Sequence, residues 1–227
     1  MVEDYLSDRE QEEALRAWWR DNWRWIIGGI VLGIALLGGY FQFKDYRAHE
    51  AGEANAQYEK VRAAAQQNRL EDAQAALAPL TADHASSPYA QQGRLLVAKL
   101  QVDAGKYDEA AALLRETADS SKDDELAAIA KLRLARVMIQ QGKHDEAIAL
   151  LDVDKLGAFA GVAREIRGDA NLAKGDQNAA RAEYAAALTA DDAQIDRNIL
   201  EMKLKEVGGT PAATTDTATA DAAQGQP

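Results

Sequence analysis

The sequence contains no cysteine and only three histidines among its 227 residues. The missing cysteines exclude a disulfide framework, a Cys-based zinc site and a thiol nucleophile. The histidines, His49, His84 and His144, are too widely spaced to form a recognisable zinc-binding pattern. A Gly-rich phosphate-binding loop is also absent from the sequence. We therefore predict a non-enzymatic protein with no catalytic residues, no bound metal and no cofactor.

Positive charge is also scarce, with 26 Lys and Arg residues against 37 Asp and Glu residues. The net charge of −11 argues against nucleic acid or an anionic lipid surface as a partner of the soluble part of the chain. One acidic cluster lies between predicted helices and lacks the glycine-centred order of a calcium loop; it comprises Asp119, Asp123, Asp124 and Glu125. We interpret this cluster as a solvated surface.

One long apolar run is present, WIIGGIVLGIALLGGYFQF at residues 25–43, and it contains no charged residue. A helix of this length extends about 28 Å, close to the roughly 30 Å hydrocarbon core of a bilayer. Aromatic residues mark both ends, as they do at membrane interfaces; they are Trp18, Trp19, Trp23, Trp25, Tyr40, Phe41, Phe43 and Tyr46. We predict a transmembrane helix in preference to a buried core helix.

The run does not resemble a cleaved signal peptide, because an acidic leader precedes it and no small-residue cleavage site follows it. We therefore expect a permanent anchor. Positive charges flanking the run are too evenly divided to decide its orientation; they are Arg16, Arg20 and Arg24 before it, and Lys44 and Arg47 after it.

Two pairs of small residues in the run, Gly29 with Gly33 and Ala35 with Gly39, have the spacing that lets membrane helices approach closely. These four residues are our candidates for helix pairing in the membrane. Glycine is also common in membrane helices that do not pair, so ordinary composition stays open as the alternative.

After the run, residues 44–207 are rich in alanine and charged residues, and their periodicity is helical. A turn motif recurs at Asn68, Gly105, Gly142 and Gly175, at intervals of 37, 37 and 33 residues. A small residue follows each turn, and a large apolar residue follows four positions later; the pairs are Ala73/Leu77, Ala110/Leu114, Ala147/Leu151 and Ala180/Tyr184. A helix pair of this kind cannot bury its apolar face alone, so the pairs must stack.

The repeats G-K-Y-D-E-A-x-x-L-L and G-K-H-D-E-A-x-x-L-L resemble the turn and second-helix start of tetratricopeptide (TPR) repeats. Two features depart from that pattern. The closing proline is missing, and the large aromatic residue early in the first helix is replaced throughout, by Gln57, Arg94, Lys131 and Arg164.

The resulting fold class is all-α: a single N-terminal transmembrane helix followed by a TPR-like α-solenoid of about four helix pairs with a C-terminal capping helix. We predict first helices over residues 48–67, 88–104, 123–141 and 159–174, second helices over 69–83, 106–119, 143–152 and 176–189, and the capping helix over 192–205. The predicted regions are a leader (1–24), a transmembrane helix (25–43), a TPR-like domain (44–207) and a disordered tail (208–227) that lacks large apolar residues.

The whole arrangement resembles the YfgM family, the ancillary SecYEG translocon subunits of Gram-negative bacteria. The likeness rests on E-D-Y-L-S-D-R-E-Q at residues 3–11, W-W-R-D-N-W at residues 18–23, the anchor and the D-E-A repeats. It implies a single-pass inner-membrane protein with its N-terminus in the cytoplasm and its repeats in the periplasm. It further implies association with the SecYEG translocon and the chaperone PpiD, with newly exported polypeptides as further partners.

Stacked helix pairs form grooves that bind peptide segments, mainly along their first helices. From the repeat register, we predict eight residues that face such a groove or pack beneath it: Arg94, Val97, Gln101, Lys131, Leu134, Met138, Arg164 and Asn171. Packing between repeats is the alternative role for several of them. Two other functions stay open, a TPR adaptor of another envelope complex, such as cell division or outer-membrane assembly, and an enzyme with an unrecognised site.

Overall fold

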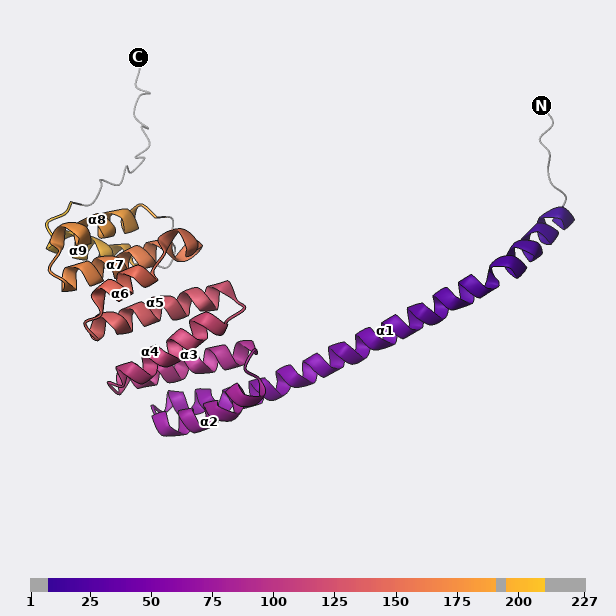
Figure 1. The fold of residues 1–227 in the computed structure, drawn as a ribbon, viewed down its shortest axis with the longest axis horizontal. Coiled ribbons are helices and arrows are strands. Elements are labelled where there is room, and N and C mark those ends of the chain that lie inside the picture. Colours follow the sequence, from indigo (N-terminus) through magenta and orange to yellow (C-terminus); the bar gives the residue numbers. More distant parts are fainter. Residues whose placement is uncertain (1–7, 191–194, 211–227) are drawn as a thin grey trace, which may run out of the picture. The chain divides into compact units, whose positions relative to one another are not determined.

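The computed structural model describes residues 8–190 and 195–210, with side chains from Gln11 onward, and these ranges contain helices and no strand (Figure 1). The α-helices are α1 (Asp8–Gln66), α2 (Leu70–Asp83), α3 (Pro88–Asp103), α4 (Tyr107–Ser120), α5 (Asp124–Gln140), α6 (His144–Leu150), α7 (Ala160–Ala173), α8 (Gln177–Leu188) and α9 (Arg197–Glu206). Two 3-10 turns, Val153–Lys155 and Gly157–Phe159, join α6 to α7. The predicted all-α class is confirmed, and residues 191–194 and 211–227 lie outside the described part.

Helix α1 is continuous from Asp8 to Gln66, and it joins the predicted leader, span and first repeat helix into one element. No proline occurs in this stretch, so every residue can contribute an amide to the helical hydrogen bonds. The contacts of the chain divide it after Glu53 into two units. The second unit therefore begins with the last turns of α1.

The first unit exposes many large apolar side chains between Leu15 and Tyr46. Outside this segment, the described side chains include only two more exposed large apolar residues, Ile199 and Met202. One helix of the described chain is long and apolar enough to cross a membrane, and it contains the predicted span. An apolar surface of this length is unfavourable in water and suits a lipid environment.

In the second unit, the four repeat turns share one conformation. Asn68, Gly105, Gly142 and Gly175 all have positive φ, between 52° and 85°. The amide after each turn residue donates to a carbonyl five residues earlier, for example Lys106 N to Gln101 O at 2.8 Å. This is the left-handed helix ending that glycine and asparagine favour, and it lets the next helix begin at once.

The predicted small and large positions pack as expected. Ala73, Ala110, Ala147 and Ala180 are almost completely buried, and so are Leu114, Leu151 and Tyr184 four residues later in the chain. Figure 1 shows the resulting stack, with α2 at one end and α7, α8 and α9 together at the other.

In the fourth repeat, the first helix packs against the second through different residues. A Cβ atom placed on Gly168 would lie 2.3 Å from the Tyr184 ring, so only glycine leaves room for this tyrosine. At the equivalent first-helix positions, the second and third repeats have Ala98 and Ala135. These alanines lie in one core cluster with Leu114 and Leu151, whose side chains are smaller than that of tyrosine. The glycine and the tyrosine of the fourth repeat therefore compensate for each other in volume.

Specific contacts close individual helices and the C-terminal end of the stack. Asp123, from the predicted acidic cluster, caps α5 by accepting bonds from the amides of Glu125 and Leu126. At the C-terminal end of the stack, Leu200, Leu204 and Val207 of the α9 region pack on α8. Gly208 and Gly209, which the sequence analysis assigned to the tail, donate backbone bonds to the last turn of α9.

Candidate partner-binding grooves

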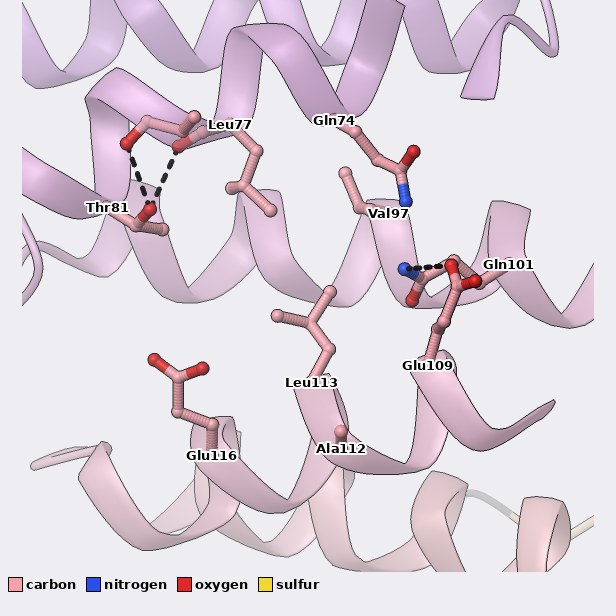
Figure 2. Close-up of a pocket in the computed structure, with 10 residues that line it drawn as sticks. Gln74, Leu77, Thr81, Val97, Gln101, Glu109, Ala112, Leu113 and Glu116 are labelled. Atoms are coloured by element: carbon pink, nitrogen blue, oxygen red, sulfur yellow. Dashed lines mark hydrogen bonds between the residues drawn. The ribbon is translucent and has the colours of Figure 1, made fainter. Parts of the chain in front are cut away.

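A groove lies between α2 and α4, with α3 beneath it (Figure 2). It has a volume of about 350 Å³, and we call it the second-helix groove because its walls belong to the second helices of two pairs. Leu77, Val97 and Leu113 point into its centre. The full lining is Gln74, Leu77, Ala78, Thr81, Val97, Gln101, Glu109, Ala112, Leu113 and Glu116.

Polar contacts of this groove are made mainly by α3 and α4. Gln101 Nε2 donates to Glu109 Oε2 at 3.4 Å, while Gln101 Oε1 is buried without a partner. Arg94 lies beside the groove, and its Nη2 pairs with Glu116 Oε1 at 2.9 Å. Arg94 Nη1 also donates to the Ala85 carbonyl, so this guanidinium ties the loop before α3 to α4.

The structure packs most of the predicted groove residues of the α3/α4 and α5/α6 pairs against neighbouring helices. Arg94 and Val97 are 5% and 1% exposed, and Gln101 forms part of the groove floor. In the next pair, Leu134 and Met138 are buried in the main core, while Lys131 is half-buried.

The predicted residues of the last pair occupy similar packing positions. Arg164 Nη1 pairs with Glu183 Oε2 of α8 at 3.6 Å, and Arg164 borders a separate cavity beside Gly157. Asn171 is buried, and its carbonyl accepts the Asp176 amide in the repeat turn. The structure thus gathers Val97 and Gln101 into one groove and leaves the other predicted residues outside it.

A different groove runs along the first helices α3 and α5. Its lining comprises Ala98, Lys99, Val102, Leu114, Arg133, Arg136 and Val137, and we call it the first-helix groove. Arg136 also borders two adjoining cavities, one that extends to Lys203 of α9 and one that extends to Glu165 of α7. The first-helix groove combines an apolar floor with cationic walls.

The cations of the first-helix groove are incompletely neutralised. Lys99 Nζ pairs with Asp103 at 2.6 Å. Arg133 donates only to the Leu95 carbonyl, at 3.5 Å, and burial together with the neighbouring Arg136 lowers its pKa. Arg136 has no hydrogen-bond or ion-pair partner among the residues that the structure describes. The groove therefore has an unused capacity to bind carboxylates.

Sequence reasoning did not select Lys99, Arg133 and Arg136, although a signal for them was available. Lys99 and Arg136 occupy the same repeat position, 37 residues apart, and Arg133 lies one helical turn before Arg136. A search for equal charges at equivalent repeat positions would have found this row.

Beyond Arg136, a charge network fastens α9 to α7. Lys203 Nζ contacts Glu165 Oε1 at 2.7 Å and both Asp169 oxygens at 2.8 and 2.9 Å. The Tyr184 hydroxyl donates to Asp169 Oδ1 at 2.8 Å. Burial opposes the charge of Lys203, but the hydrogen bonds that it donates to Asp169 and Glu165 outweigh burial and raise its pKa. Burial and then Asp169 also raise the pKa of Tyr184.

The membrane-pairing candidates in α1 are open positions. A Cβ atom placed on Gly29, Gly33 or Gly39 would meet no atom within 4 Å. At about 100° per residue, the Gly29/Gly33 pair and the Ala35/Gly39 pair lie roughly 120° apart around the helix. The two spacings therefore belong to two different faces of α1.

Comparison with known proteins agrees with the repeat architecture. The tetratricopeptide repeat-like domain family matches residues 16–209 of this chain. The chain belongs to this family. The match includes the apolar part of α1 as well as the helix pairs, so the anchor and the repeats form one recognised arrangement.

Curated relatives are similar to this chain over nearly their whole length. A protein of Escherichia coli (strain K12), named ancillary SecYEG translocon subunit, is 27% identical over 91% of this chain and 99% of the relative. Proteins with the same name from Haemophilus influenzae and Neisseria gonorrhoeae are each 28% identical, over 89% and 88% of this chain and 99% and 97% of the relatives. The resemblance found in the sequence analysis is confirmed.

Proposed function

We propose that this protein is a non-enzymatic scaffold of the bacterial inner membrane that associates with the SecYEG translocon. Its TPR-like domain binds partner chaperones, PpiD among them, or newly exported polypeptides. The observation that carries the proposal is the full-length similarity to ancillary SecYEG translocon subunits, joined to a membrane-length apolar helix and a stack of helix pairs.

The proposed topology has the leader, residues 1–24, in the cytoplasm, residues 25–43 in the membrane and residues 44–207 in the periplasm. A reporter enzyme that is active only in the periplasm, fused after Val207, tests this arrangement. Activity of the fusion is expected, because the resemblance to ancillary translocon subunits implies that the residues after the span lie in the periplasm. An inactive but stably produced fusion would indicate the opposite orientation.

Within the repeats, we assign partner binding to the first-helix groove. Its apolar floor suits aliphatic side chains, and Lys99, Arg133 and Arg136 suit carboxylates beside them. The predicted residue Arg94 then acts indirectly, by fastening α3 to α4, two of the helices that line the groove. A groove of this chemistry favours acidic, partly apolar segments of a partner.

Affinity purification in mild detergent tests the proposed partners. The intact protein is compared with a variant that carries an unrelated membrane helix in place of residues 25–43. We expect SecY and PpiD to copurify with the intact protein, and SecY to be lost from the variant. Absence of both from the intact sample would instead favour an adaptor of another envelope complex.

A further inference from the structure

We propose that the second-helix groove is an additional docking site, which binds a short extended polypeptide segment with basic residues on either side of an apolar one. This inference goes beyond the proposed function, which assigns partner binding to the first-helix groove. It rests on three features of the groove: an apolar floor, an unsatisfied buried acceptor and two carboxylates at the rim.

The floor offers a place for one aliphatic side chain. Leu77 and Val97 are buried at its base, and Leu113 forms a half-buried wall (Figure 2). Ala78 and Ala112 on the facing helices are small and exposed, so the space between α2 and α4 stays open. An inserted leucine or valine would exchange contact with water for contact with these apolar groups.

The acceptor beside this floor is Gln101. Its side chain is 6% exposed, and its Oε1 atom has no hydrogen-bond partner. Its Nε2 atom is already used by Glu109, which determines the direction in which the amide oxygen points. An unpaired buried acceptor is unfavourable, so a ligand that supplies an N–H group there gains affinity.

The rim adds two carboxylates on one face of α4. Glu109 and Glu116 are seven residues apart, or two helical turns, which corresponds to about 10.5 Å along the axis. Both side chains are more than half exposed. Lys106, an exposed side chain, lies 3.7 Å from Glu109 Oε1, so a basic ligand would compete with a surface lysine there. Arg94 pairs with only one oxygen of Glu116, so the second oxygen stays available to a ligand.

Gln74 and Thr81 also line the walls. The Thr81 hydroxyl donates its proton to the Leu77 or Ala78 carbonyl, each 3.1 Å away, and its oxygen can still accept a hydrogen bond. The Gln74 amide can both donate and accept. The groove therefore offers several acceptors to a ligand. The complementary ligand is rich in N–H donors, as lysine, arginine and extended peptide backbone are.

The spacing of the carboxylates defines the ligand further. Residues of an extended chain that share one face are two or four positions apart, about 7 or 13 Å, and the four-residue interval lies nearer to the carboxylate spacing of about 10.5 Å. A segment of the form basic-x-apolar-x-basic therefore directs its apolar side chain at the floor. Its two flexible basic side chains then reach Glu109 and Glu116.

The test uses the full-length protein in a non-ionic detergent and a fluorescent acetyl-Lys-Ala-Leu-Ala-Lys-amide peptide. Fluorescence anisotropy should show saturable binding that is lost when Glu replaces both lysines or Ser replaces the leucine. Glu109→Gln combined with Glu116→Gln should weaken binding about three- to tenfold. Ala112→Trp should abolish binding, because the indole fills the open groove.

A matched control removes the same charge elsewhere. Glu71→Gln with Glu146→Gln lies in the first turns of α2 and α6, outside the groove, and should leave the affinity unchanged. Arg133→Gln with Arg136→Gln should also leave it unchanged, which separates this site from the first-helix groove. Thermal unfolding followed by circular dichroism verifies that each variant is folded. Failure of the wild type to bind the peptide, or equal binding by a folded Ala112→Trp protein, would overturn the proposal.

Discussion

The two grooves share α3 and α4 and nevertheless have opposite chemistry. Neighbouring residues of α3 face different grooves: Val97 and Gln101 line the second-helix groove, whereas Ala98 and Val102 line the first-helix groove. On α4, Leu113 and Leu114 divide in the same way, and helix geometry explains this, since successive residues differ by about 100° around the axis. A shift of one residue in register thus exchanges a carboxylate-rimmed surface for a cationic one.

This comparison explains the placement of the predicted groove residues. Arg94, Val97 and Gln101 have the correct repeat register but lie on the side of α3 that faces α2 and α4. Lys99 lies roughly 200° away from Val97 and faces the other groove. Equivalent positions in successive repeats were recognisable from the sequence, but the side that they face was not.

The largest effect is expected from reversing the charge of the first-helix groove. Arg133→Glu combined with Arg136→Glu should reduce binding of a fluorescent acidic peptide, acetyl-Glu-Ala-Leu-Ala-Glu-amide, by more than about tenfold, because attraction becomes repulsion. Fluorescence anisotropy of the full-length protein measures this. The reversal should not weaken binding of the corresponding lysine peptide; a parallel loss of both peptides would show that the grooves are not independent.

Loss of the α9 contacts should lower the stability of the fold and leave the second-helix groove intact. Lys203→Met leaves Glu165 and Asp169 close together without their cation, so we expect a loss of about 1–3 kcal/mol in the free energy of unfolding. Urea denaturation measures the change. Binding at the second-helix groove should persist, since α9 contributes nothing to its lining.

Alkaline pH should also lower the stability of the fold through the α9 contacts. The folded-state pKa of Lys203 is raised, so its contribution is fully present below the ordinary lysine pKa of about 10.4 and is lost as pH rises through the raised value. Tyr184, whose pKa is also raised, changes stability in the same direction. Lys203→Arg keeps the positive charge at high pH. Between pH 9 and pH 11, the melting temperature of the wild type should therefore fall further than that of Lys203→Arg; equal falls would assign the effect to Tyr184 alone.

A smaller effect is expected beneath the second-helix groove. Arg94→Met keeps most of the buried volume but removes the bond to Glu116, so the unfolding free energy should fall by about 1–2 kcal/mol. The variant should also bind the lysine peptide more tightly, because Glu116 loses a competing cation. Lys99→Met is the matched control, since it breaks an exposed pair and should change stability by less than about 0.5 kcal/mol. Weaker peptide binding by Arg94→Met would count against a role for Glu116.

Much of the fold could be predicted because its signals are local. The turn residues Asn68, Gly105, Gly142 and Gly175 show where helices end, and the structure gives all four a positive φ. The small and large residues after each turn indicate which helix faces are buried. The continuity of α1 was missed because a change from apolar to charged composition resembles a boundary, although no helix-breaking residue occurs there.

The sequence by itself determined the helical class, the membrane-length apolar run, the repeat register and the family, because these depend on spacing along the chain. Tertiary structure alone decided which side of each helix became a groove. That choice depends on how the helices pack against one another, as in the contact between Gly168 and Tyr184 or the ion pair between Arg94 and Glu116. Contacts between residues distant in sequence are not encoded in local periodicity, so the chemistry of a surface follows from packing as well as composition.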